Sequence, residues 1–248
     1  MADYRQNSMY NTQTGARTDA HLIDEGLRSY MLRVYNYMAL GIAFTAVVTL
    51  VMLNSPALMQ TIAMGPAKWV LFIAILGLGF FAPRLILTGN TMMAHAAFWT
   101  YAALWGTLIS PMILAFIQGG KPELIFQALA ITSATFAATS LFGYTTKKDL
   151  SAYGTFFMMA TIGLIIAIVV NIFLQSTLFS LITSFAVVLL FSAITAYETQ
   201  EIKQSYYAGD DQNTATGKAI FGAFILYGSF ITLFIHILNI LGIMGGDD

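Results

Sequence analysis

Seven apolar stretches, each about long enough to cross a bilayer, occupy most of this 248-residue chain. A helix needs about 20 residues to span the hydrocarbon layer. The stretches lie at residues 34–53, 69–87, 94–117, 123–144, 153–174, 177–200 and 218–242, and a polar tail, residues 1–29, precedes them. They are continuous apolar runs and not short segments that alternate apolar and polar residues, which excludes a transmembrane β-barrel. The sequence therefore predicts an all-α integral membrane protein with one seven-helix domain over residues 30–248.

The composition agrees with this class. Hydrophobic residues make up 58% of the chain and charged residues 9%, whereas soluble domains average roughly 45–50% and 25%. The formal net charge is −1 and no basic patch is present, so nucleic acid is not an expected partner. The chain has no cysteine, which excludes disulfides, thiolate metal sites and a cysteine nucleophile.

The lysines and arginines between the spans predict the orientation, because basic residues collect in cytoplasmic loops. A cytoplasmic N-terminus places nine of them inside and two outside. The inside set is Arg5, Arg17, Arg28, Arg33, Arg84, Lys147, Lys148, Lys203 and Lys218, and the outside set is Lys68 and Lys121. Seven spans then put the C-terminus outside the membrane. The alternative is six spans with the Thr- and Ser-rich stretch 123–144 re-entrant.

Small residues four apart predict where helices pack closely, because they let two backbones approach. Such pairs are Ser133 with Ala137 and Ala134 with Ala138, and Gly77 and Gly79 lie in the second span. We expect these positions to face neighbouring helices.

An acid inside the predicted spans is the strongest functional signal. Glu198, in Ala-Tyr-Glu-Thr-Gln, lies five residues before Lys203, which is about 7 Å along a helix axis. It therefore lies near the cytoplasmic end of the sixth span. It either reaches headgroup water or a basic partner, or it faces the bundle interior, where it could exchange a proton near neutral pH and bind a hard cation through oxygen.

Three other polar residues are candidates. Arg84 ends the second span, where it serves as a positive-inside anchor or faces Glu198 as a latch that protonation breaks. Ser229 and His236 lie seven residues apart in the last span, on one face of the helix. His236 is either a member of a proton relay or a neutral side chain hydrogen-bonded between helices.

Enzymatic and pigment functions lack support in the sequence. Two helical turns separate Ser229 from His236 by about 10 Å, too far for a Ser–His catalytic pair. There is no Gly-x-Ser-x-Gly, His-Glu-x-x-His or Walker motif,, and no lysine inside a span that could carry retinal,. An inverted repeat with broken helices, which would indicate a transporter, is also lacking. We expect no catalysis, no cofactor and no metal site.

Four segments together resemble the Bax inhibitor-1 family, also called the transmembrane Bax inhibitor motif family. Residues 29–41 resemble the entry to its first span, and residues 136–151 resemble the link between its fourth and fifth spans. Residues 196–203, Ala-Tyr-Glu-Thr-Gln-Glu-Ile-Lys, are similar to its Tyr-Asp-Thr-Gln-x-Ile signature. Residues 226–234, Leu-Tyr-Gly-Ser-Phe-Ile-Thr-Leu-Phe, are similar to its Leu-Tyr-Leu-Asp-Phe-Ile-Asn-Leu-Phe signature.

The resemblance implies a seven-helix bundle with two layers around a central last helix. It also implies a pH-sensitive calcium leak, gated by a pair of aspartates on the sixth and seventh helices and an arginine on the second. The sixth-helix aspartate corresponds to Glu198, the seventh-helix aspartate to Ser229, the arginine to Arg84, and the asparagine of the last signature to Thr232. Thr232 and His236 are accessory candidates, and one carboxyl of the family pair is replaced by a hydroxyl.

The leading functional hypothesis is a pH-sensitive leak pathway for calcium ions or protons in the bacterial inner membrane, gated by Glu198 with Ser229 and Arg84. The alternative is a non-conducting membrane protein that modulates a membrane-bound protease or another membrane complex. Other bacterial members of the family are linked to such a protease, and the replaced aspartate favours this alternative.

Overall fold

The computed structural model describes residues 2–86 and 90–245, with side chains for 25–62, 64–86 and 90–245. Every element in these ranges is helical. The long helices are α1 (Ala2–Leu53), α3 (Ala67–Ile86), α4 (Thr91–Gln118), α5 (Glu123–Thr145), α6 (Gly154–Leu174), α7 (Thr177–Gln204) and α8 (Gln212–Met244), and the short ones are α2 (Pro56–Leu58), η1 (Met59–Met64) and η2 (Ser151–Tyr153). Seven helices are long and apolar enough to cross a membrane, as predicted.

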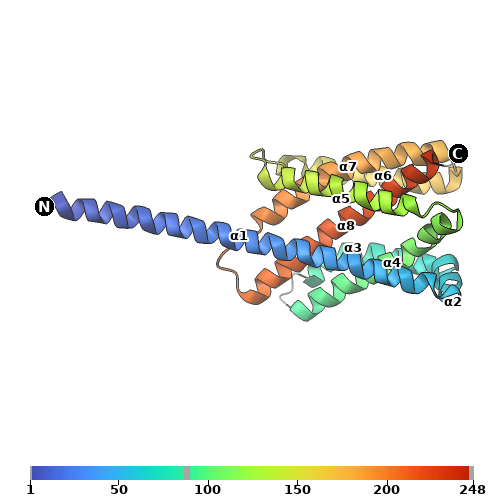
Figure 1. The fold of residues 1–248 in the computed structure, drawn as a ribbon, viewed down its shortest axis with the longest axis horizontal. Helices are drawn as coiled ribbons and strands as arrows, with labels where there is room; N and C mark the ends of the chain where they lie inside the picture. The colour runs from blue at the N-terminus through green and yellow to red at the C-terminus, as the bar shows by residue number, and fades with distance from the viewer. Residues whose placement is uncertain (1, 87–89, 246–248) are drawn as a thin grey trace.

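The last helix is the centre of the bundle. Figure 1 shows α8 running diagonally between one group of helices, α5, α6 and α7, and a second group, α1, α3 and α4. In the apolar part of α8, 67% of the residues are buried, against 28% or less in the other six spans. Both groups therefore bury their inner faces against α8.

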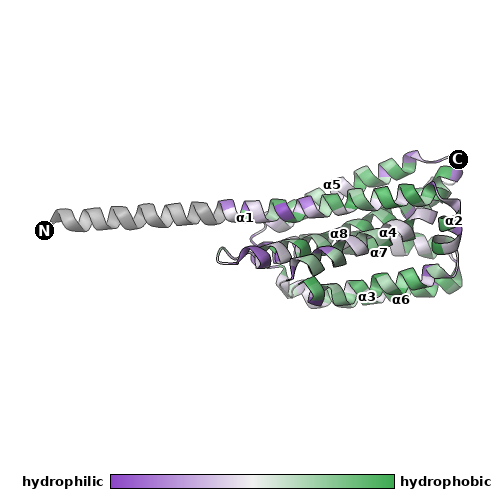
Figure 2. Cartoon of the chain, turned by 90° about the horizontal axis from the view of Figure 1, so that it is seen from below, coloured by the Kyte–Doolittle hydropathy of each residue, from purple (hydrophilic) through white to green (hydrophobic). Residues whose placement is uncertain are grey.

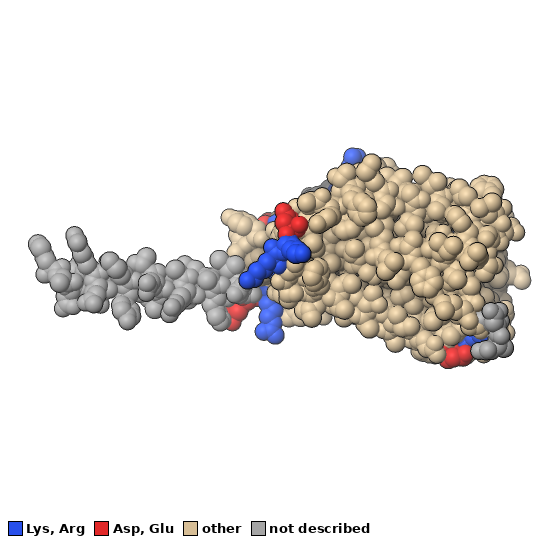
Figure 3. Space-filling view, turned by 90° about the horizontal axis from the view of Figure 1, so that it is seen from above, with Lys and Arg blue, Asp and Glu red and all other residues tan. Residues whose placement is uncertain are grey.

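The two ends of the bundle are named here by the chain termini nearest to them. At the amino end lie the emerging α1, the loop 146–150 and the loop 205–211, and at the carboxyl end lie Gly245 and the turn between α6 and α7. Figure 2 shows apolar residues along the helices and hydrophilic ones at their ends. In Figure 3 the charged side chains on the visible face gather at the two ends, and the surface between them carries none. This distribution fits a belt of lipid around the middle.

Several helices continue beyond the apolar stretches that predicted them. Glu25–Leu53 of α1 is apolar enough to span, yet the helix begins at Ala2 and includes most of the polar tail. α7 extends to Gln204 and α8 begins at Gln212. Hydropathy marks the part of a helix inside hydrocarbon, whereas the hydrogen-bonded helix continues into water. α5 is unbroken from Glu123 to Thr145, which disfavours the re-entrant alternative.

Side-chain caps fix where α7 and α8 start. The Ser176 hydroxyl accepts the Phe179 N–H at 3.2 Å and begins α7. The Asp211 carboxylate accepts the Thr214 N–H at 2.6 Å and begins α8. The backbone hydrogen bond from Thr214 holds the pKa of Asp211 below its usual value, because it stabilises the charged form.

Close helix contacts occur at glycines other than the predicted small-residue pairs. A Cβ on Gly106 would lie 2.7 Å from the Thr45 carbonyl oxygen, and one on Gly143 would lie 2.8 Å from the Ala196 carbonyl carbon. The pairs Ser133/Ala137 and Ala134/Ala138 are exposed. A Cβ on Gly77 would meet nothing within 4 Å, and one on Gly79 would come no closer than 4.0 Å to the Tyr101 hydroxyl oxygen. The packing prediction for those positions was wrong, because small residues on the lipid-facing side of a helix show the same spacing.

Candidate gating site between α7 and α8

Two of the predicted site residues are in direct contact. The Ser229 hydroxyl on α8 donates to the Glu198 carboxylate on α7, with 2.6 Å between Oγ and Oε2. Ser229 is buried, at 2% exposure, while Glu198 is partly buried. The bond joins the helix pair with the most extensive contact in the bundle. Glu198 therefore faces the bundle interior and not the lipid headgroups alone.

The Glu198 carboxyl also faces a pocket at the amino end, with a volume of about 460 Å³. The pocket lies between α1, α7 and α8. Its polar lining consists of Tyr30, Tyr197, Glu198, Glu201, Ser205 and Lys218. A carboxyl in this position can exchange a proton with water in the pocket while it holds Ser229 on its other side.

Lys218 and Tyr30 hold the chain that borders this pocket. The Lys218 ammonium lies 2.6 Å from the Asp210 carboxylate and donates to the Ser205 carbonyl at 3.1 Å. The Tyr30 hydroxyl lies 3.1 Å from the Ser205 hydroxyl. The loop 205–211 is therefore fastened to α1 and α8 beside Glu198.

Arg84 is at the amino end but not in this contact. Ile86, two residues later, lies beside Gly217 of α8, and the Arg84 side chain is exposed. Within the described ranges it forms no ion pair or side-chain hydrogen bond with Glu198. This position fits the anchor interpretation, and the hydroxyl of Ser229 is the partner that Glu198 has.

His236 belongs to a second polar cluster, nearer the carboxyl end. Its Nδ1 lies 3.0 Å from the Ser184 hydroxyl. The Asn239 amide donates at 2.9 Å to both Ser184 and Ser180. Asn239 also lines a pocket of about 250 Å³ at the carboxyl end, together with Lys121. The cluster thus joins α7 to α8 beside that pocket.

An apolar segment of α8 separates the Ser229–Glu198 hydrogen bond from the His236–Ser184 contact. Phe230, Leu233 and Phe234 lie between Ser229 and His236 in the helix, and each is at most 8% exposed. Thr232, the other accessory candidate, donates to the Gly228 carbonyl of its own helix at 2.9 Å. It satisfies its hydroxyl locally and does not bond to Glu198.

The sequence did not reveal which residues fix the last turns of α7, at the amino end of the bundle, to its other neighbours. The Gln200 amide accepts the Leu150 N–H at 2.7 Å and donates to the Lys148 carbonyl at 2.8 Å. Lys203 donates to the Tyr144 carbonyl at 2.8 Å and stands over the Tyr144 ring. Both residues lie in the segment 196–203, so its similarity to the family signature was the sequence feature that could have indicated them.

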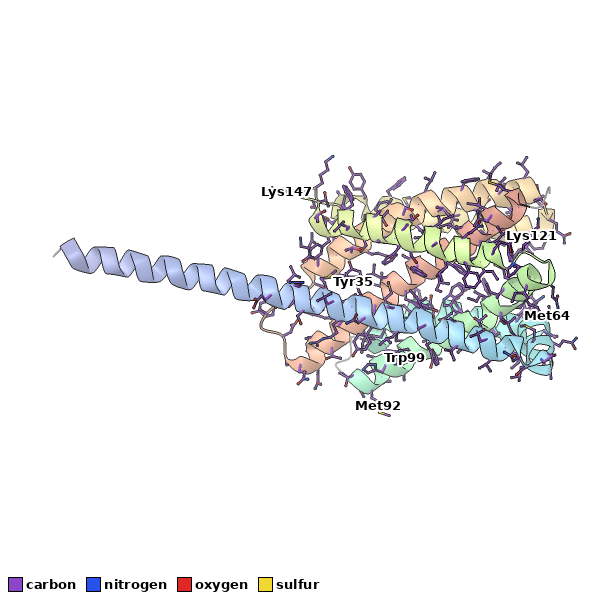
Figure 4. The ribbon with its side chains drawn as sticks, in the orientation of Figure 1. Tyr35, Met64, Met92, Trp99, Lys121 and Lys147 are labelled. Carbon is purple, nitrogen blue, oxygen red and sulfur yellow. The ribbon has the colours of Figure 1, made fainter. Side chains whose placement is uncertain are left out.

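A chain of hydroxyls fixes the same part of α7 to α5 and α1. The Ser140 hydroxyl lies 2.7 Å from that of Tyr35 and 2.9 Å from that of Thr199. Figure 4 labels Tyr35 on α1, with Lys147 and Lys121 at opposite ends of α5. Glu198 is thus carried on a helix segment held by α1, α5 and the loop 146–150.

We expect Gln200→Ala to release the loop 146–150, because the variant loses both hydrogen bonds to it. Two such bonds contribute about 1–2 kcal/mol together, so the open population should rise about tenfold. Tryptic cleavage after Lys147 and Lys148 in detergent micelles measures this, since cleavage follows the open population. Gln127→Ala, at an exposed position on α5, is the control. Equal cleavage in the two variants would contradict the assigned role.

Comparison with known proteins identifies the family. A family model described as "Inhibitor of apoptosis-promoting Bax1" matches residues 27–246. The chain belongs to the Bax inhibitor-1 family. It is 37% identical to an uncharacterized protein of Rickettsia prowazekii over 88% of this chain and 91% of that one. It is 36% identical to an uncharacterized protein of Deinococcus radiodurans over 91% and 94%.

A third relative has a named location. The chain is 33% identical to the inner membrane protein YbhL of Escherichia coli, over 88% of this chain and 92% of that one. Together with the seven apolar helices, this similarity indicates a multi-pass inner membrane protein. The resemblance seen in the four sequence segments is confirmed.

Proposed function

We propose that this Bax inhibitor-1 family protein is a passive pathway for calcium ions or protons, and that the protonation state of Glu198 controls it. The supporting observation is the 2.6 Å bond from Ser229 to Glu198, at the border between α7, α8 and a pocket of about 460 Å³. The amino end is placed in the cytoplasm, because nine of the eleven lysines and arginines belong to that side,. The proposal includes no enzymatic activity.

The proposed mechanism depends on the strength of that hydrogen bond. A hydrogen bond to an ionised carboxylate is roughly twice as strong as one between neutral groups. Protonation of Glu198 from the pocket therefore weakens the α7–α8 contact. The buried Phe230, Leu233 and Phe234 form the closed barrier, since hydrophobic constrictions exclude water and ions until they widen. Weakening the contact favours the widened state, so acid increases conduction.

The test is ion flux in proteoliposomes that hold the purified protein. We expect wild-type flux of calcium or protons to increase as the pH changes from mildly alkaline to mildly acidic, and Glu198→Gln to lose this pH dependence. Glu123→Gln makes the same chemical change at an exposed position at the carboxyl end and should behave as wild type. Unchanged flux and unchanged pH dependence in Glu198→Gln would refute the proposal.

One observation supports the non-conducting alternative. None of the described residues of α6 is buried, and the helix packs mainly against α7. A second membrane protein, such as a protease, could pack on this apolar surface. Crosslinking from α6 in native membranes would detect such a partner, and a partner without any ion flux would favour this function.

A further inference from the structure

We propose that the ion carried is the proton, and that Ser229 and Lys218 make the pathway unsuitable for calcium. This inference rests on the proposed function, because it names the ion that the same site would carry.

The oxygen ligands around Glu198 are too few for calcium. Calcium takes 6–8 oxygen ligands, several of them carboxylates. Glu198 has a neutral hydroxyl as its partner on α8, and the next carboxyl in the pocket is the exposed Glu201, one turn along α7. Within the described ranges no group of three or more acidic, histidine or cysteine side chains could hold a metal ion. A proton needs a single carboxyl.

The pocket also contains a lysine that is held in an ion pair. Lys218 lines it from α8, and Glu198 and Glu201 line it from α7. The remaining polar side chains of the pocket carry hydroxyls, and they are Tyr30 on α1, Tyr197 on α7 and Ser205. The ammonium is held in place by Asp210 and the Ser205 carbonyl. The ion pair also occupies the Asp210 carboxylate, so this carboxylate is not free to serve as a calcium ligand.

The groups along the α7–α8 contact suit a proton. Intramembrane carboxyls and histidines are the usual members of proton relays. Here Glu198 lies beside the pocket at the amino end and is bonded to Ser229. His236 lies two turns along α8 from Ser229, is bonded to Ser184, and is near the pocket that Asn239 lines. A short file of transient water in the apolar segment between them could pass a proton. Calcium would lose its hydration shell there and gain no ligands in return.

The experiment measures proton and calcium entry separately, with a pH dye or a calcium dye inside proteoliposomes and potassium with valinomycin to balance charge. For the wild type we expect proton flux well above that of protein-free liposomes, and calcium flux equal to theirs. Glu198→Gln should abolish the proton flux. His236→Gln, which can still bond to Ser184 but cannot carry a proton, should reduce it several-fold.

The gain-of-function variants test the role of Ser229 and Lys218. Ser229→Asp places a second carboxyl beside Glu198 and should bring calcium flux above the baseline. Lys218→Gln frees the Asp210 carboxylate and should also increase calcium entry, most clearly when combined with Ser229→Asp, whereas Lys218→Arg keeps the ion pair and should not. Size-exclusion profiles and thermal unfolding show which variants are folded. Ser229 and Lys218 act independently, so a folded variant at either residue alone can test the inference.

The outcomes separate this inference from the proposed function. Calcium flux in the wild type whose pH dependence is lost in Glu198→Gln would overturn the proton assignment and leave the gated pathway intact. Absence of calcium entry in folded Ser229→Asp and Lys218→Gln would overturn the role given to these residues. Absence of flux for both ions in the wild type would refute the proposed function itself.

Discussion

Replacement of Tyr227 by alanine is expected to cause the largest loss of stability of any change discussed here. Tyr227 is 0% exposed in the middle of α8. Its ring lies 5.9 Å from the rings of Phe98 and Tyr101, and its hydroxyl lies 2.7 Å from that of Thr45. Large-to-small changes of buried aromatic residues cost about 3–5 kcal/mol. The variant loses aromatic contacts between α4 and α8 and the hydrogen bond to α1.

Thermal unfolding in detergent, followed by helix content or by aggregation, measures this effect. Tyr207→Ala removes the same side chain from a loop position that is 67% exposed, and we expect it to unfold at nearly the wild-type temperature. If the two variants unfold at the same temperature, the assignment of Tyr227 to the core of the bundle is contradicted.

Gly143→Ala is expected to destabilise the contact between α5 and α7 although it adds one methyl group. An added Cβ would meet the backbone of Ala196, with its carbonyl carbon and Cα both at 2.8 Å. Backbone atoms cannot move aside as the end of a side chain can, so the helices must separate. Overpacking of this kind typically costs about 1–3 kcal/mol. Because Ala196 lies two residues before Glu198, we also expect the variant to alter ion flux.

Gly163→Ala is the matched control, since a Cβ there would meet nothing within 4 Å. Alanine is more favourable than glycine inside a helix by about 1 kcal/mol, so this variant should be as stable as wild type or slightly more stable. A Gly143→Ala protein with unchanged stability would show that α5 and α7 are less closely packed than the structure indicates.

The helix count was predictable from sequence, and the arrangement was predictable in part. Continuous apolar runs have one solution in a bilayer, so seven helices follow from seven stretches. The central place of α8 does not follow from its apolar composition, because lipid and a protein interior both favour apolar residues. It was expected here from the family resemblance. The wrong prediction for Ser133 and Ala137 has the same origin, since small residues do not reveal which face of a helix they occupy.

The residues of the candidate site were likewise predictable from sequence only in part. An acid in an apolar run indicated Glu198, and the paired family signatures brought Ser229 to it, as the structure does. The hydrogen bonds of Gln200 to Lys148 and Leu150 depend on a loop about fifty residues away in the sequence. No spacing within α7 encodes that contact. Likewise, the separation of His236 from Ser229 into another cluster depends on where Ser184 lies on the neighbouring helix.

The exposed position of α6 means that the bilayer itself can act on the site. None of its described residues is buried and its main contact is with α7, so in a bilayer the rest of the helix would meet lipid. A change in membrane thickness tilts or shifts a transmembrane helix to relieve hydrophobic mismatch, at a cost of fractions of a kcal/mol per Å. The first neighbour to feel such a tilt is α7, which carries Glu198. If the protein conducts as proposed, lipids of different chain length should therefore shift its ion flux at constant pH.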